Sequence, residues 1–178
     1  ATPAGSRVYV TEGEKAADAA QAVGLTATTS PHGGKSAKQA DWSPVGGRHV
    51  VILVDNDAAG EKYGEDVVRL CMAAGALSVR VVRLVDLWAG MPEGGDIVDY
   101  LKHRGGNVEA VRADVEALSD KTEPMTPDTV PDAPAVLRFD LNAVIPNGAA
   151  YARDYLASVS RSTQTPIEMP ALLGLAIA

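Results

Sequence analysis

The chain has 178 residues, a formal net charge of −7, an apolar content of 46% and only 4% aromatic residues. This length supports one hydrophobic core with an appendage, and the negative charge argues against tight non-specific binding of nucleic acid by this part alone. The single cysteine, Cys71, excludes a disulfide framework. With no signal peptide and no apolar segment long enough to span a bilayer, we expect a cytoplasmic protein with no membrane partner.

The first predicted strand, residues 7–11, is rich in β-branched and aromatic side chains and leads into a predicted helix over 13–23. Glu12 lies between the two, at the carboxyl end of the strand. Taken alone, Glu12 and Glu14 are explained by a favourable interaction with the helix dipole. A second strand is predicted over 25–29.

A segment rich in glycine and hydroxyl side chains, residues 28–38, begins at the end of the second strand and carries Lys35. It lacks the upstream glycine that a P-loop requires. The spacing alone leaves two interpretations equally open. The segment is either a solvated loop or a loop whose backbone N–H groups and Lys35 contact phosphate.

The most informative segment is an unbroken apolar run within residues 48–54, which predicts a strand buried on both faces. Asp55 and Asp57 follow it directly, and a helix is predicted over 59–74. Ligands of open α/β sheets lie at the carboxyl ends of strands, where carboxylate oxygens suit a hard divalent cation. A turn with a helix N-cap explains one of these aspartates but not the pair.

Three further elements complete the predicted core: a strand over 78–84 and helices over 96–104 and 107–118. Asp96 begins the first of these helices, where a helix cap and a site role are equally good explanations. The alternation of strands and helices predicts a parallel sheet with right-handed crossovers. For Glu12 to meet Asp55, the first and third strands must be neighbours, with a cleft at that switch point.

The regular pattern ends near residue 120. Four prolines follow within residues 121–135, which predicts an extended linker after a first domain over 1–120. Residues 136–178 resemble the truncated start of a helical, helicase-like domain. Because the last apolar helix pattern stops partway at residue 178, we expect the chain to be part of a longer protein.

Three motifs, each on the expected element, carry a resemblance to a known family: Glu12-Gly13, Asp55-x-Asp57-x-Ala59-Gly60 and Asp96-x-x-Asp99-Tyr100-Leu101. Together they resemble the TOPRIM domain, most closely that of DNA primases and primase-helicases of phages, plasmids and integrated elements. The resemblance covers about residues 6–118. It implies an α/β fold with a Rossmann-like parallel sheet of about four strands flanked by helices, here followed by a helical C-terminal appendage.

The resemblance also implies roles for individual residues: Glu12 as general acid/base, Asp55, Asp57 and Asp96 as ligands of Mg²⁺ or Mn²⁺, and Lys15, Lys35 and Gly60 as contacts to phosphate or nucleic acid. One position departs from the family pattern. Primases of this type usually carry an aspartate four residues after the glutamate, where this chain has Ala16. Asp18 is turned about 200° round the helix from it. A second metal position therefore lacks its ligand, which leaves catalytic competence open.

The implied function is Mg²⁺-dependent nucleotidyl transfer for RNA primer synthesis in DNA replication. Single-stranded DNA template and nucleoside triphosphates would act through the longer protein, with a replicative helicase domain as partner in cis or in trans. The isolated fragment is expected to make no primers, because it lacks a basic template-holding subdomain. Two alternatives stay open: a TOPRIM metal-dependent nuclease, and a non-catalytic TOPRIM module that docks on a replicative helicase. The linker favours a primase over a nuclease, whereas Ala16 and the acidic charge favour the non-catalytic module.

Overall fold

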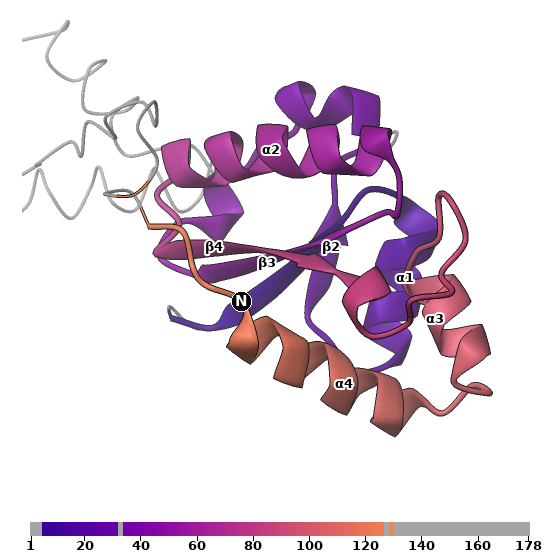
Figure 1. The fold of residues 1–178 in the computed structure, drawn as a ribbon. Helices are drawn as coiled ribbons and strands as arrows, with labels where there is room; N and C mark the ends of the chain where they lie inside the picture. The colour runs from indigo at the N-terminus through magenta and orange to yellow at the C-terminus, as the bar shows by residue number, and fades with distance from the viewer. Residues whose placement is uncertain (1–4, 32–33, 127–128, 130–178) are drawn as a thin grey trace, which may run out of the picture. The chain divides into compact units, whose positions relative to one another are not determined.

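A computed structural model of the chain describes residues 5–31, 34–126 and 129. Strands and helices alternate through this part of the chain (Figure 1). The strands are β1 (Arg7–Thr11), β2 (Ala27–Thr29), β3 (His49–Val54) and β4 (Ser78–Arg83). The α-helices are α1 (Glu14–Ala22), α2 (Ala58–Ala73), α3 (Ile97–His103) and α4 (Val108–Lys121), with short 3-10 helices η1 (Gly34–Gln39), η2 (Ser43–Val45) and η3 (Leu84–Asp86). The strands and α-helices predicted over residues 1–120 are therefore present.

The four strands form one parallel sheet in the order β2-β1-β3-β4. β1 thus pairs with β2 on one side and with β3 on the other. This confirms the prediction that the first and third strands are neighbours, and it places a topological switch point between them. In open parallel sheets, ligands bind outside the carboxyl ends of the strands at such a point.

β3 is the central strand by burial, since its residues from Val50 to Val54 are all buried. Val51 and Leu53 pack in the core on one face of the sheet, and Val50 and Ile52 pack in the core on the other. A strand covered on both faces needs apolar residues at every position. The uninterrupted apolar run in the sequence is therefore explained by the two cores.

Helices cover both faces of the sheet, which gives three layers. Contacts and core membership place α1, α3 and α4 on one face and α2 with η1 on the other. Figure 1 shows α2 above the sheet and α4 below it. The chain therefore has an α/β fold with a Rossmann-like parallel sheet flanked by helices, as predicted. No helix in these described segments is long and apolar enough to cross a bilayer.

The segment over 28–38 differs from the predicted loop, because part of it is the helical turn η1. The cause is a packing contact that the local sequence pattern does not indicate. Ala37 is buried in the core beneath α2, and the carbonyl of Ala37 accepts a hydrogen bond of 2.8 Å from Trp42 Nε1. Local sequence shows glycine and polar residues here, but burial of one alanine and one tryptophan fixes the turn.

The free edge of β4 is covered by the residues that follow α4. Val79 and Met125 form an antiparallel bridge, with the Val79 N–H donating to Met125 at 2.9 Å and the Met125 N–H donating to Val79 at 2.8 Å. The first residues of the predicted linker over 121–135 thus lie against the sheet. The rest of that linker (except Thr129) and the predicted helicase-like segment over 136–178 lie outside the described residues.

Candidate active site

Glu12, Asp55 and Asp57 follow the ends of two adjacent parallel strands. In the β1–β3 register, Thr11 is opposite Leu53, so the two strands end at nearly the same level. The three acids therefore emerge at the same carboxyl edge of the sheet. The structure brings them together although more than 40 residues separate Glu12 from Asp55 in the chain.

Asp55 is the acid most affected by its surroundings. Burial is the largest cause, followed by the negative charges of Glu12, Asp96, Asp57 and Asp99, and together they raise the pKa of Asp55 to about 7. Burial and the charge of Asp57 also raise the pKa of Glu12. We call these five residues the acidic edge, because the negative charges of the other four all act on Asp55.

Two acids of this group also begin helices. Asp57 is the N-cap of α2 and accepts a hydrogen bond of 2.7 Å from the Gly60 N–H through Oδ1. Asp96 is the N-cap of α3, where it accepts from Val98 N–H at 2.7 Å and from Asp99 N–H at 3.2 Å. The capping explanation therefore holds for both. Capping does not exclude a role in the site, since the charge of each capping carboxylate still contributes to the raised pKa of Asp55.

Asn56 ties the turn after β3 to the segment that leads into α3. Its side-chain Nδ2 donates to the carbonyls of Met91 at 3.1 Å and Pro92 at 3.0 Å. Its backbone N–H donates to Gly95 and its carbonyl accepts from Gly94, both at 3.0 Å. With four hydrogen bonds across this seam, Asn56 fixes the start of α3 beside the carboxyl end of β3.

We expect Asn56→Ala to cost about 1–2 kcal/mol of unfolding free energy, because two side-chain hydrogen bonds, one of them partly buried, are lost, and to speed amide exchange over residues 91–95. Asn107→Ala is the matched control, since Asn107 caps α4 with a bond to Ala110 N–H and has no contact with this seam. Denaturant unfolding and hydrogen exchange measure both effects. Unchanged exchange at 91–95 in Asn56→Ala would contradict the assignment.

Gly60 is fixed by close packing as well as by hydrogen bonding. A Cβ at Gly60 would lie only 2.4 Å from the backbone oxygen of Asp55, a distance that no side chain tolerates. Its N–H donates to Asp57. The glycine therefore lets the first turn of α2 approach the acidic edge, and its phosphate contact stays a prediction.

The two predicted lysine contacts are placed differently. Lys15, exposed at the start of α1, lies near enough to Asp99 for its charge to help lower the pKa of Asp99, to which the hydrogen bond from Lys102 contributes most. Lys15 is therefore beside the acidic edge. The side chain of Lys35 lies outside the described part of the structure, and its phosphate contact stays a prediction.

The structure shows where the two residues lie that mark the departure from the TOPRIM pattern, Ala16 and Asp18. Ala16 is buried in the core beneath α1, whereas Asp18 is exposed on the outside of that helix. The angle of about 200° expected from helical geometry thus places Ala16 on the buried side of α1 and Asp18 on its exposed side. Asp18 does not replace the acid that the family carries at the position of Ala16.

The acidic edge fits a divalent cation by its chemistry. Carboxylate oxygens are hard ligands, and a cation would offset the neighbouring negative charges that, after burial, raise the pKa of Asp55. Among the described residues, no three His, Cys, Asp or Glu side chains are grouped closely enough to hold a metal alone. Mg²⁺ is commonly held by one or two carboxylates, with water and substrate phosphates completing its shell. This arrangement suits Asp55 and Asp57, the latter through its Oδ2 atom.

Sequence analysis alone does not single out Tyr63, which supports the end of β1. Its hydroxyl donates to the carbonyl of Thr11 at 2.9 Å and lies 3.4 Å from Ser30 Oγ. Burial is the main reason that the pKa of Tyr63 is raised. The sequence feature that points to Tyr63 is an aromatic residue with a polar hydroxyl on the apolar face of the helix that follows Asp57.

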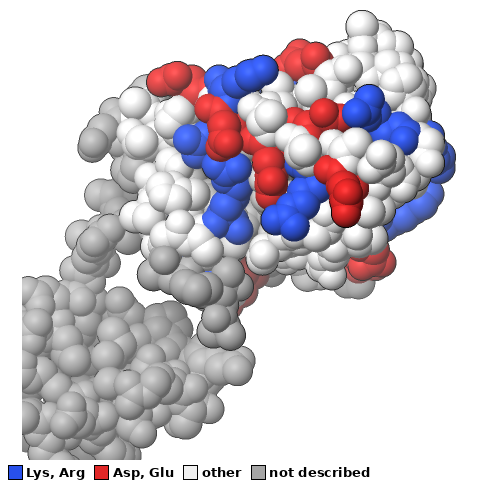
Figure 2. Space-filling model, turned by 90° about the horizontal axis from the view of Figure 1, so that it is seen from below, with Lys and Arg blue, Asp and Glu red and all other residues white. Residues whose placement is uncertain are grey.

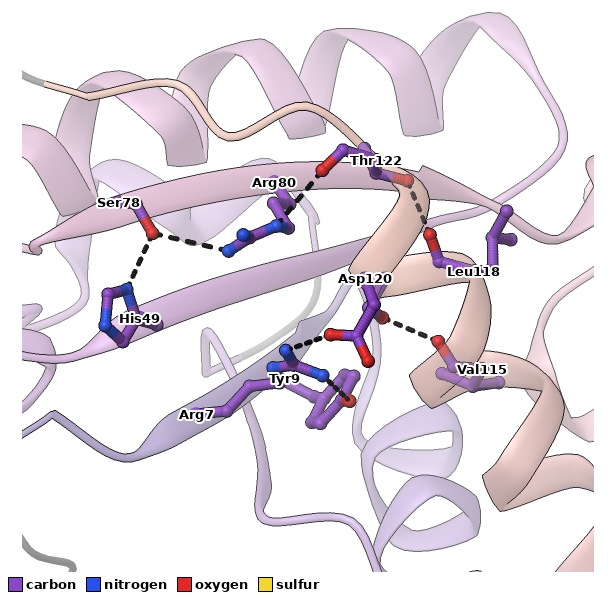
Figure 3. Close-up of polar contacts among 10 residues, drawn as sticks. Arg7, Tyr9, His49, Ser78, Arg80, Val115, Leu118, Asp120 and Thr122 are labelled. Atoms are coloured by element: carbon purple, nitrogen blue, oxygen red, sulfur yellow. Dashed lines mark hydrogen bonds and ion pairs between the residues drawn. The ribbon is translucent and has the colours of Figure 1, made fainter.

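The amino edge of the sheet, opposite the acidic edge, also carries polar side chains, but these are paired (Figure 3). Arg7 donates to the Tyr9 hydroxyl and to the Asp120 carboxylate at the end of α4. His49 Nδ1 lies 2.8 Å from Ser78 Oγ. These contacts join α4 to β1 and join β3 to β4.

Comparison with known proteins gives a likeness of fold. No protein-family model matches the chain, and no curated protein matches it. A crystal structure of the Aquifex aeolicus primase, containing its zinc-binding and RNA polymerase domains, matches with a TM-score of 0.50 and 21% identity. That match covers 67% of this chain and 26% of that one. The chain therefore has a primase-type fold.

A DNA primase domain from Pseudomonas aeruginosa also matches, with a TM-score of 0.43 and 20% identity, over 67% of this chain and 34% of that one. The chain thus spans about a quarter and a third of the lengths of these two proteins.

Proposed function

We propose that this chain is the TOPRIM catalytic module of a DNA primase or primase-helicase of the phage or plasmid type. In this proposal it performs Mg²⁺-dependent nucleotidyl transfer in RNA primer synthesis. The observation that carries the proposal is the acidic edge, where acids that follow β1 and β3 and begin α3 lie close enough to act on Asp55, whose pKa burial and these charges together raise to about 7. The primase-type fold supports it independently.

We assign each residue a role from its surroundings in the structure. Asp55 and Asp57 would hold Mg²⁺, which when bound neutralises charge on the phosphates and orients the attacking oxygen. Glu12, whose pKa is raised by burial and by Asp57, would accept the proton of the attacking hydroxyl. A carboxylate with a raised pKa is suited to proton transfer near neutral pH. Lys15 would offset charge beside the same site.

Template binding would come mainly from other parts of the protein. The face seen in Figure 2 carries acidic and basic side chains in alternation, without a continuous basic surface among the residues described there. Basic side chains near α4 are paired with acids, as in Arg104–Asp114 between the end of α3 and α4 and Arg112–Glu116 within α4. We therefore propose that single-stranded DNA and a replicative helicase domain act with this module rather than on it alone.

One specific observation favours a second candidate, a non-catalytic module docking on a replicative helicase. Ala16 is buried and Asp18 exposed, so one family acid has no substitute. A module of this kind would keep the fold and the acidic edge but not activity.

Metal binding provides the direct test. We expect calorimetry to show that the chain binds Mn²⁺, and that Asp55→Asn weakens the affinity at least about tenfold, since a principal ligand is removed. Asp18→Asn is the matched control and should bind as the wild type does, because Asp18 is exposed away from the site. Absence of Mn²⁺ binding by the wild type would refute the catalytic proposal.

A further inference from the structure

The outer edge of β4 is covered only at its beginning. Val79 bonds to Met125 there, and the N–H and C=O groups of a strand point to alternate sides from one residue to the next. The same groups of Val81 and Arg83 therefore also point away from β3. Among the residues that the structure describes, the Val81 N–H, the Val81 C=O and the Arg83 N–H have no hydrogen-bond partner. Three backbone groups of this edge are thus open to another chain.

A groove of about 620 Å³ lies beside this open edge, between α2 and the residues that follow α4. Its apolar surface comes from Val68, Val81 and Met125. Val68 belongs to the core beneath α2, and the other two are partly buried against that core. Apolar side chains at alternate positions of an added strand would pack on them, while its backbone would meet the open groups of β4. The groove therefore suits an extended polypeptide better than a compact ligand.

The rim of the groove is acidic once its own ion pairs are taken into account. Arg83 is bound by Glu61 through two hydrogen bonds of 2.5 and 2.6 Å, and Arg69 has an acidic partner outside the groove. The other two charged lining residues, Glu65 and Glu123, are exposed. Neither forms an ion pair with any residue in the described part of the chain. A strand that carries basic side chains would therefore complement this rim.

We propose that this groove binds an extended polypeptide that alternates apolar and basic residues, and that the polypeptide adds to the sheet as a strand beside Val81 and Arg83. The proposal is independent of the proposed function, since no residue of the acidic edge lines the groove. A second copy of this chain fits less well, because it would bring the same exposed acids, Glu65 and Glu123, to the same rim.

The test measures binding of a short blocked peptide that alternates valine and lysine to the whole chain, by calorimetry and amide hydrogen exchange. We expect the bound peptide to slow exchange at the Val81 and Arg83 amides. The Val79 amide, already bonded to Met125, should be unchanged. The same peptide with every backbone nitrogen methylated should not bind, because it has no N–H to donate. A peptide that alternates valine and glutamate should bind at least about tenfold more weakly.

Variants of the chain assign the binding to this groove. Glu65→Gln and Glu123→Gln should each weaken binding of the lysine peptide about two- to fivefold, the effect of losing one exposed ion pair. Glu109→Gln is the matched control, since Glu109 is exposed in the first turn of α4 and does not line the groove. Val81→Pro removes the outward N–H without breaking a bond to β3 and should weaken binding about tenfold. If denaturant unfolding shows that this variant does not fold, the methylated peptide tests the same hydrogen bonds.

Three results would overturn the proposal: no binding of the lysine peptide, equal binding of the methylated peptide, or unchanged exchange at the Val81 and Arg83 amides in the bound state. Protection of these amides that rises with protein concentration, without peptide, would also overturn it and would assign the edge to a second copy. Equal protection of the free chain at every concentration would overturn it in favour of another segment of this chain.

Discussion

Glu12→Gln is expected to reduce primer synthesis by the full-length protein by about 10²–10⁴-fold, the usual contribution of a positioned general base. The amide keeps the size of the side chain but accepts no proton. Folding should not be weakened, because burial and the charge of Asp57 both disfavour the ionised carboxylate of Glu12 in the folded state. Primer assays on a single-stranded template measure the effect, with Mn²⁺ affinity as a check that the site is intact.

The matched control for this change is Glu14→Gln. Glu14 is exposed in the first turn of α1, two residues from Glu12 in sequence. Its interaction with the helix dipole contributes only about 0.3–1 kcal/mol, so activity should stay near that of the wild type. If Glu12→Gln and Glu14→Gln retained equal, full activity, Glu12 would have no part in proton transfer.

Metal-free protein should lose stability as the pH rises from about 4 to 7, and Asp55→Asn should remove that loss. The folded-state pKa of Asp55, about 7, lies above the ordinary value of 3.8. Between these values the folded chain binds more protons than the unfolded chain, so the free energy of unfolding falls with increasing pH. After allowance for partial exposure of the carboxylate, the loss is about 1–2 kcal/mol.

This effect is measured by denaturant unfolding in EDTA between pH 5 and pH 8. Asp55→Asn should be closest to the wild type near pH 5 and exceed its stability most near pH 8, and saturating Mg²⁺ should raise the stability of the wild type alone. Asp66→Asn is a control of opposite sign, since Arg69 lowers the pKa of Asp66 and its contribution is present at neutral pH. A wild-type profile parallel to that of Asp55→Asn would show that Asp55 is ordinarily ionised.

The sheet could be predicted because its signals are local. The apolar run before Asp55 identified β3, and the alternation of elements required parallel strands whose carboxyl ends share one edge. From that rule alone, Glu12 and Asp55 could be expected at the same place. The β2 strand begins later than the predicted residue 25, because the Leu25 N–H bonds to Ala20 and closes α1.

The support of the site could not be predicted, because it depends on contacts between distant segments. Asn56 reads locally as a turn residue, yet its four hydrogen bonds go to residues 91–95. The hydroxyl of Tyr63, on α2, reaches the carbonyl of Thr11 at the end of β1, a contact that no spacing rule indicates. Sequence identified the acids, and tertiary packing identified what holds and surrounds them.

The bridge between Val79 and Met125 sets a practical limit on how the unit can be shortened for study. Ending the polypeptide at Asp120, where the regular helical pattern stops, would strip the Val79 N–H and C=O of their partners. An uncovered outer strand invites pairing between molecules. A boundary placed after residue 126 retains that cover, so recombinant versions cut there are the suitable starting material for crystallisation or spectroscopy.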